Sequence, residues 1–229
     1  MKNFAFIFVR GGSKGLPGKN IKPLAGKPLL QYSIDIAKAC SSISQVFVST
    51  DDNDIAKVAT DAGAVLIRRP DELATDTSPE WLSWRHAIEW VKAHYGDFDN
   101  FISLPATSPL RSVEDVEGAI VQREKAAADV CISVTPSSRS PYFNMVTIGQ
   151  EGFVDLVNQP DAEVTRRQDA PEVFDITTVV YVMTPDFILN QYGLFNGKVT
   201  SIEVPKSRAV DIDDIYDFRL AEAILAGEE

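Results

Sequence analysis

The feature that most constrains the fold of this 229-residue chain is the alternation of short apolar runs with amphipathic segments along its length. The runs are rich in β-branched and aromatic residues and predict strands at 4–9, 46–49, 65–67, 101–104, 131–134, 177–183 and 199–203. Helical patterns, several of them with Asp, Ser or Pro at their start, lie at 28–40, 52–62, 79–94, 113–127 and 214–226. We therefore predict an α/β fold, with a Rossmann-like, mostly parallel sheet and helices on both faces.

Residues 136–173 interrupt this alternation. The segment contains four prolines and many polar residues, and its one apolar stretch is 143–148. We predict an inserted arm of two short strands within a single domain that covers 1–229, and we expect the arm to act as a lid, a dimer contact or both.

The charge of the chain is unevenly distributed. The formal net charge is −11, which argues against DNA, RNA or an anionic membrane surface as a partner. Yet no acidic residue precedes Asp35, while Lys2, Arg10, Lys14, Lys19, Lys22 and Lys27 all lie before it. A basic patch in an acidic protein indicates a site for a small anion such as phosphate.

The cysteines and the hydropathy of the chain indicate the cellular compartment to expect. Cys40 and Cys131 have neither disulfide-framework nor metal-ligand spacing and lie in apolar surroundings, which is typical of reduced core residues in a cytoplasmic protein. No run of about 18 apolar residues is present, so we expect no membrane-spanning helix.

A glycine-rich loop follows the first predicted strand, with the sequence RGGSKGLPGKN at 10–20. A glycine turn at the carboxyl end of a strand lets backbone N–H groups approach a phosphate, and Arg10, Lys14 and Lys19 add positive charge. The P-loop pattern is not met, because Gly18-Lys19 is followed by Asn20, and the glycine spacing does not match the dinucleotide-binding fingerprint.

The loop does match a strand followed by R-x-G-S-K-x-x-x-x-K-N, through Arg10, Gly12, Ser13, Lys14, Lys19 and Asn20. Further blocks follow in order: VSTDD at 48–52, RPDEL at 69–73, DT at 76–77, TSPLR at 107–111, RQ at 167–168 and DID at 211–213. In these blocks the chain resembles the acylneuraminate cytidylyltransferase family from residue 4 to about residue 225. The resemblance implies a nucleotide-diphospho-sugar transferase type of fold.

The resemblance also implies an activity. We expect transfer of CMP from CTP to the anomeric hydroxyl of a sialic-acid-like 3-deoxy-2-ulosonic acid, an acidic keto-sugar, with release of pyrophosphate. It implies Mg²⁺ as the cofactor and a homodimer formed through the 136–173 arm.

Site residues follow from the same resemblance. For the nucleotide they are Val9, Arg10, Gly12, Ser13, Lys14, Lys19, Asn20, Arg69 and Thr77. The catalytic set is Arg10, Lys14, Lys19 and Asp211, and the sugar-binding set is Thr107, Ser108, Arg111, Arg167, Asp175 and Thr177. For Arg111 two roles stay open, one in substrate binding and one in the structure, while Arg167 is favoured for the sugar carboxylate.

Asp211 and Asp213 flank Ile212 just before the last predicted helix. In an extended segment, residues two apart point to the same side, and two carboxylates there suit Mg²⁺. The alternative is that the pair caps the helix, since Asp is a favourable N-cap residue. Asp51 and Asp52 are weaker metal candidates, for which capping is the favoured role, and His86 and His94 have no plausible catalytic partner.

The chain departs from the family pattern at its sugar-facing blocks. Pro105-Ala106 replaces a Gln-Pro pair, Asp175 and Thr177 replace a cationic and an amide side chain, and Glu80 stands where many relatives have serine. We therefore expect an acceptor other than N-acetylneuraminate. Two alternatives remain: a nucleotidyltransferase that uses another nucleotide and a sugar phosphate, and a nucleotide-binding module without catalysis.

Overall fold

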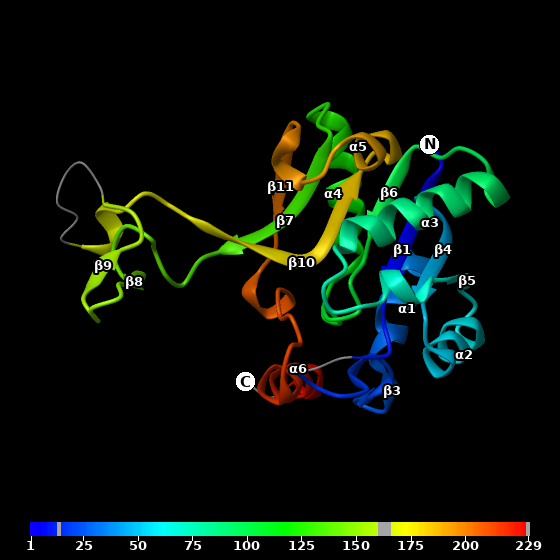
Figure 1. The fold of residues 1–229 in the computed structure, drawn as a ribbon, viewed down its shortest axis with the longest axis horizontal. Helices are drawn as coiled ribbons and strands as arrows, with labels where there is room; N and C mark the ends of the chain where they lie inside the picture. Colours follow the sequence, from blue (N-terminus) through cyan, green and yellow to red (C-terminus); the bar gives the residue numbers. More distant parts are fainter. Residues whose placement is uncertain (13–14, 160–165, 228–229) are drawn as a thin grey trace.

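The computed structural model describes residues 1–12, 15–159 and 166–227, and its centre is a seven-stranded sheet (Figure 1). The strand order is β11-β7-β10-β6-β1-β4-β5. The strands are β1 (Asn3–Phe8), β4 (Ile43–Thr50), β5 (Val65–Arg68), β6 (Asn100–Ser103), β7 (Val130–Pro136), β10 (Phe174–Met183) and β11 (Val199–Glu203). Every pair is parallel except those of β10, which runs antiparallel to β6 and β7.

Helices cover both faces of this sheet, as the sequence predicted. They are α1 (Leu29–Ala39), α2 (Asn53–Asp61), α3 (Glu80–Tyr95), α4 (Val113–Lys125), α5 (Pro185–Asn190) and α6 (Ile215–Ala226). Successive side chains of a strand point to opposite faces, so β1 contributes to two cores. Ala5 and Ile7 pack with α1, α2 and α4, while Phe4 and Phe6 pack with α3 and α5.

The helix starts show why the chain folds locally as it does. Asp52 caps α2, since its side chain accepts hydrogen bonds from the N–H groups of Asp54 and Ile55. Ser112 and Asp115 form a capping box at α4, in which each side chain accepts a hydrogen bond from the other's backbone N–H. The capping role predicted for Asp52 is thus confirmed.

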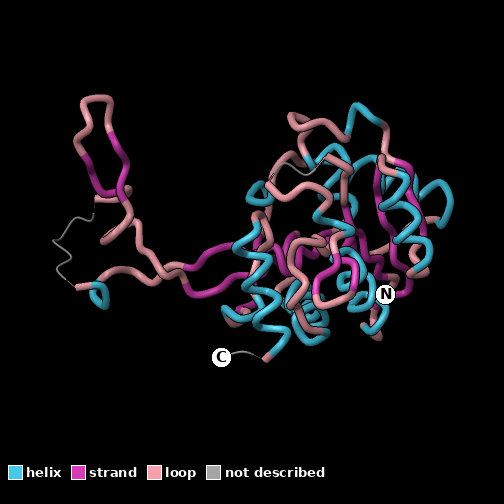
Figure 2. The backbone as a smooth tube through the Cα atoms, turned by 90° about the horizontal axis from the view of Figure 1, so that it is seen from below, coloured by secondary structure: helices cyan, strands magenta, loops and turns pink. Residues whose placement is uncertain are grey.

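The inserted arm extends from β7 and β10, which stay paired as far as Pro136 and Phe174. Beyond that point β8 (Val146–Ile148) and β9 (Val154–Leu156) form the antiparallel pair that the sequence indicated. Figures 1 and 2 show this pair standing away from the main sheet and its helices.

The remaining elements are short and were not predicted. They are β2 (Pro23–Leu24), β3 (Lys27–Pro28), the helix α5 and the 3₁₀ turns η1 (Lys19–Ile21), η2 (Asp71–Leu73), η3 (Arg167–Asp169), η4 (Leu194–Asn196) and η5 (Lys206–Arg208). Such elements are too short for a periodic apolar pattern to develop. Among the described helices, none combines the length and the apolar character needed to cross a bilayer.

Candidate active site

The candidate site lies at the carboxyl edge of the sheet. β1 is paired with β4 on one side and with β6 on the other, so the connections after these strands diverge next to β1. Ligands of open parallel sheets bind where the strand order reverses in this way. The loops that follow β1, β5 and β6 carry most of the predicted site residues, and the fold brings these loops to one edge.

The segment 211–213, which precedes α6, borders the site. Ile212 and Phe218 pack with Leu24 and Leu29 in a small apolar cluster, which holds α6 against the 16–32 region. α6 contacts β2, and Figure 1 shows it at the same end of the sheet as β3. This packing brings residues that are nearly 200 positions apart in the sequence into one site.

The glycine loop packs against two segments that carry carboxylates, residues 51–52 after β4 and residues 211–213 before α6. A Cβ atom added at Gly11 would lie 2.6 Å from Asp52 Oδ2, and one added at Gly15 would collide with the backbone oxygen of Asp213. Gly11 N–H also donates a hydrogen bond to Asp51 Oδ1 at 3.3 Å. The loop therefore needs glycine for close approach, whereas Gly12 faces open space. Ser13 and Lys14 lie outside the described residues.

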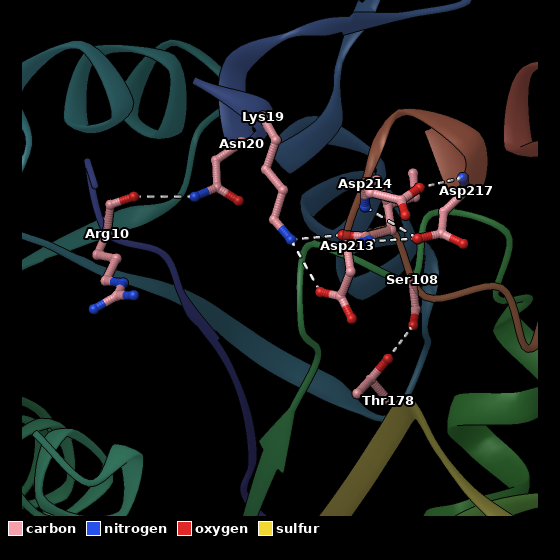
Figure 3. A network of polar contacts seen from close by, with 9 residues as sticks. Arg10, Lys19, Asn20, Ser108, Thr178, Asp213, Asp214 and Asp217 are labelled. Atoms are coloured by element: carbon pink, nitrogen blue, oxygen red, sulfur yellow. Dashed lines mark hydrogen bonds and ion pairs between the residues drawn. The ribbon is translucent and has the colours of Figure 1, made fainter. Parts of the chain in front are cut away.

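Lys19 connects the glycine loop to the segment that precedes α6 (Figure 3). Its Nζ donates to the Ile212 carbonyl at 2.5 Å and lies 3.3 Å from Asp213 Oδ1. The adjacent Asn20 is buried and donates from Nδ2 to the Arg10 carbonyl at 3.1 Å. The structure thus places Lys19 beside Asp213 and Asn20 beside the Arg10 backbone, while the Arg10 guanidinium points away from them (Figure 3).

Asp211 and Asp213 differ in environment. Asp213 is exposed, whereas Asp211 is half-buried and its Oδ1 has no hydrogen-bond partner. Burial raises the pKa of Asp211 above its ordinary value, as does the charge of Asp213, while hydrogen bonds from Thr107 and Thr178 act in the opposite direction. A half-buried carboxylate oxygen without a partner fits a cation ligand.

The interpretation of this pair as the helix cap is wrong. The N-cap of α6 is Asp214, whose Oδ1 accepts hydrogen bonds from the N–H groups of Tyr216 and Asp217. Asp217 in turn accepts from the Asp213 and Asp214 N–H groups, so the helix start is satisfied without the Asp211 carboxylate. No group of three or more metal-ligating side chains occurs in the described part of the chain, so an ion bound by Asp211 and Asp213 would need further oxygen ligands.

One cavity, of about 280 Å³, lies on the side of Arg10 and Arg69, and we refer to it as the nucleotide cavity. Arg69 is buried, and its guanidinium donates to the carbonyl and the hydroxyl of Ser49, at 2.8 and 3.2 Å. Arg10 forms an ion pair of 2.8 Å with Asp76, which also lines this cavity. Thr77 belongs to the same 75–78 segment and is exposed.

A second cavity, of about 320 Å³, lies on the side of β6 and β10, and we refer to it as the acceptor cavity because Thr107, predicted for the sugar, lines it together with Val9 and Asn20, which were predicted for the nucleotide. Its lining consists of Phe8, Val9, Asn20, Glu80, Trp84, Pro105, Ala106, Thr107, Thr178, Tyr181 and Leu194. The hydroxyls of Ser108 and Thr178 are 2.6 Å apart (Figure 3). Trp84, Tyr181 and Leu194 were not predicted, because Trp84 and Tyr181 belong to an ordinary helix and an ordinary strand and Leu194 lies in an unpredicted turn.

Thr177, predicted for the sugar, is not among the residues that line the acceptor cavity, and its neighbour Thr178 lines it instead. Thr177 is buried and its hydroxyl donates to Ser133 Oγ at 2.7 Å. The pairing of β10 with β7 shifts between Thr177 and Tyr181, and Ser133 Oγ bonds the backbone of this irregular stretch. An irregular pairing of this kind changes the direction in which side chains point, and a sequence pattern does not reveal such a change. Asp175 is exposed, two residues into β10.

Of the two roles left open for Arg111, the structure supports the structural one. The side chain is buried, and its guanidinium donates to Val179 O at 2.7 Å, to Ser33 Oγ at 2.5 Å and to Pro105 O. Burial lowers the pKa of Arg111, and the charges of Asp115 and Asp211 oppose that shift. The second arginine predicted for the sugar, Arg167, begins the η3 turn, and its side chain lies outside the described part.

The fold and these cavities together define an α/β protein in which Lys19 of the glycine loop meets the Asp211–Asp213 segment beside two cavities at the carboxyl edge of the sheet. A family model described as cytidylyltransferase matches residues 4–220, and the chain belongs to this family. The class of enzyme expected from the sequence, a nucleotidyltransferase, is therefore confirmed.

Curated relatives agree with this assignment. The chain is 32% identical to the post-translational flagellin modification protein B of Campylobacter coli, over 96% of this chain and 93% of the relative. It is 31% identical to the CMP-N,N′-diacetyllegionaminic acid synthase of Campylobacter jejuni, over 96% and 93% respectively. With the N-acylneuraminate cytidylyltransferase of Streptococcus agalactiae serotype V it shares 27% identity, over 95% of this chain and 52% of that protein.

Solved structures show the same fold. The CMP:2-keto-3-deoxy-manno-octonic acid synthetase complexed with CTP superposes with a TM-score of 0.74 at 18% identity, over 100% of both chains. The 4-diphosphocytidyl-2C-methyl-D-erythritol synthase of Anaerococcus prevotii gives a TM-score of 0.63 at 15% identity, over 98% of this chain and 99% of that one. At these identities the likeness concerns the fold alone.

Proposed function

We propose that the protein transfers CMP from CTP to the anomeric hydroxyl of a sialic-acid-like 3-deoxy-2-ulosonic acid. The anomeric oxygen attacks the α-phosphorus, the bond from that phosphorus to the bridging β-phosphate oxygen breaks, pyrophosphate leaves, and the hydroxyl proton passes to solvent. The observation that carries the proposal is the meeting of Lys19 with the Asp211–Asp213 segment beside two cavities. Relatives named as synthases of CMP-linked acidic sugars support the acceptor class.

The chain's own residues act by position and charge. Arg69 and the buried Asn20 hold the base and ribose, while Arg10 and Lys19 neutralise charge on the triphosphate as pyrophosphate departs. Phosphoryl transfer leaves the protein little covalent work, so most of the rate enhancement comes from orientation and electrostatic stabilisation. When CTP binds, the Arg10 guanidinium exchanges its partner Asp76 for phosphate oxygens.

Cytidylyltransferases of this kind generally use a divalent metal, and we propose that here the ion is Mg²⁺. The unpartnered Oδ1 of Asp211 and the exposed carboxylate of Asp213 would hold it, with phosphate and water oxygens as further ligands. When bound, the ion supplies charge neutralisation and lowers the pKa of a coordinated hydroxyl.

The proposal extends to the arm and to the compartment. The arm exposes Val146, Ile148, Phe153 and Val154, which favours a homodimer contact, and burial of both free cysteines suits a cytoplasmic protein. Sedimentation at micromolar concentration tests the first point. A dimer is expected, and a dimer lost when Ile148 and Phe153 are changed to Lys supports the arm as the contact. A wild-type monomer contradicts it.

A pyrophosphate-release assay over nucleotides and acceptors tests the function. We expect release with CTP and a sialic-acid-like ulosonic acid, at a rate higher than with UTP, GTP or ATP. Release only with another nucleotide and a sugar phosphate supports a different nucleotidyltransferase. Tight CTP binding without release with any acceptor supports a non-catalytic module, and either result contradicts the proposal.

A further inference from the structure

The strand β10 follows an irregular path where it lines the acceptor cavity. It pairs with β7 through Thr177 and again through Tyr181, yet their partners on β7, Ser133 and Ile132, are adjacent residues. Residues 178–180 therefore stand opposite no described residue of β7, and the two valines among them are fully buried. Backbone groups in such a stretch lose their ladder hydrogen bonds and need other partners inside the protein.

Two buried side chains bond the backbone of this stretch. The Ser133 hydroxyl lies 3.2 Å from the carbonyl oxygens of both Thr177 and Val180, which share its one hydrogen. Its oxygen accepts hydrogen bonds from the Val180 N–H at 3.1 Å and from the Thr177 hydroxyl at 2.7 Å. The Arg111 guanidinium donates to the two carbonyls in between, at 3.4 and 2.7 Å. Ser133 is therefore the contact that β7 supplies to hold the irregular path of β10.

The path of this stretch decides where the hydroxyl of Thr178 lies. Thr178 is half-buried and lines the acceptor cavity, and its hydroxyl is 2.6 Å from that of Ser108 (Figure 3). It also forms a hydrogen bond that lowers the pKa of the Asp211 carboxyl. Hydrogen bonds between oxygens form at about 2.5–3.0 Å, so a small movement of the backbone at residue 178 would break these contacts.

On the basis of the proposed function, we infer that Ser133 is a positioning residue for the acceptor. Its hydroxyl fixes the irregular stretch of β10, and that stretch presents the Thr178 hydroxyl to the ulosonic acid. Ser133 is fully buried and is absent from the described lining of both cavities, so it acts through Thr178 without touching a substrate. The described lining of the nucleotide cavity includes no residue of β10, so the effect is confined to the acceptor.

A cycle of two substitutions tests the inference. Ser133→Ala removes the positioning hydroxyl, Thr178→Val removes the hydroxyl that it positions, and the double variant combines them. Ser133→Cys keeps the size of the side chain but forms weaker hydrogen bonds, and it takes the place of Ser133→Ala if the alanine variant does not fold.

The control is Thr135→Val. Thr135 is buried two residues further along β7, on the same face as Ser133, and its hydroxyl has no hydrogen-bond partner within the described part of the chain. Its replacement therefore removes a buried hydroxyl from the same strand without disturbing β10.

The acceptor for these assays is chosen with the wild type. It is whichever of N,N′-diacetyllegionaminic acid, N-acetylneuraminate and 2-keto-3-deoxy-manno-octonic acid gives the highest kcat/KM. KM for this acceptor is measured at saturating CTP and Mg²⁺, KM for CTP is measured at saturating acceptor, and calorimetry verifies that each variant is folded.

We expect Ser133→Ala and Thr178→Val each to raise the acceptor KM about tenfold, the effect of losing one or two buried hydrogen bonds. In the Thr178→Val background, Ser133→Ala should change the acceptor KM by less than about twofold, because the hydroxyl that it positions is already gone. KM for CTP should change by less than about threefold in every variant, and Thr135→Val should match the wild type.

Three results would overturn the inference while the proposed function stands. They are an unchanged acceptor KM in Ser133→Ala, a KM for CTP that rises as much as that of the acceptor, and effects of the two substitutions that multiply in the double variant. The last result would mean that Ser133 supports the fold without acting through Thr178. If the wild type releases no pyrophosphate from CTP with any of the three acceptors, the proposed function fails and the inference fails with it.

Discussion

Arg111→Met is the substitution that best separates the two roles considered for this arginine. The guanidinium bonds four acceptors, Val179 O, Ser33 Oγ, Pro105 O and Thr178 O, and so joins α1, the loop after β6 and β10. Methionine keeps much of the buried volume but removes all of these hydrogen bonds, and among the acceptors Pro105 O keeps donors in the Ser33 hydroxyl and the Ser108 N–H. Each such loss costs about 1–3 kcal/mol, and breaking a buried charged contact costs about 3–5 kcal/mol.

We therefore expect the free energy of unfolding to fall by about 4 kcal/mol and Tm to fall by roughly 10 °C. Urea unfolding measures the change, and the three tryptophans, all on α3, provide the fluorescence signal. The control is Arg68→Met, because Arg68 is exposed and donates to Asn53 Oδ1 at 2.6 Å, and it should change stability by less than about 0.5 kcal/mol.

A different outcome would refute the structural assignment. If Arg111→Met unfolds like the wild type and instead raises KM for the sugar acceptor, then Arg111 contacts substrate. Its burial and its hydrogen bonds would then belong to a conformation that binding changes.

Three further predictions concern charged groups, two of them in the site and one at the start of α4. Lys19→Met should lower turnover roughly 10²- to 10³-fold with Tm little changed, measured as pyrophosphate release and by calorimetry, and an unchanged rate would remove Lys19 from the reaction. Asp211→Asn should raise the Mg²⁺ concentration for half-maximal rate about tenfold or more, and a wild-type metal titration would contradict its role as a ligand. Asp115→Asn should reduce stability at pH 7 by about 2 kcal/mol, because Asp115 accepts two hydrogen bonds from Arg208 at 2.8 and 2.9 Å. Burial alone would raise the pKa of Asp115, but the bonds from Arg208 and Ser112 lower it overall, so this stability is present above the unfolded pKa and lost as pH falls through the folded pKa. The free energies of unfolding of the wild type and of Asp115→Asn, measured by urea unfolding, should therefore converge as the pH falls. A difference between them that stays constant with pH would contradict this origin.

The architecture was accessible from the sequence because it depends on patterns that recur over many residues. The strand 199–203 was predicted with the bounds observed for β11, and the helix starts at Asp52 and Ser112 follow from capping chemistry. The antiparallel direction of β10 was not predicted, because strand direction depends on the connections and not on the apolar pattern.

The site could be predicted only where it depends on residue type and position next to a strand end. The glycine loop with Lys19 satisfies both conditions. Thr178 does not, because the irregular pairing of β10 decides which threonine lines the cavity. Arg111 looks like a ligand in sequence, and only its burial reveals the structural role. The ion pair of Arg10 with Asp76 joins residues 66 positions apart, which no local pattern could indicate.

The most direct test of the central claim uses CTP labelled at the α-phosphate, with Mg²⁺ and N,N′-diacetyllegionaminic acid as the acceptor. The account predicts that the label appears in a CMP-linked sugar, with one unlabelled pyrophosphate released for each product formed. Substituting Lys19 by Met should suppress both products together. If the label stays in CTP, or if product forms only with another nucleotide, the carboxyl-edge site does not carry out CMP transfer and the account is wrong.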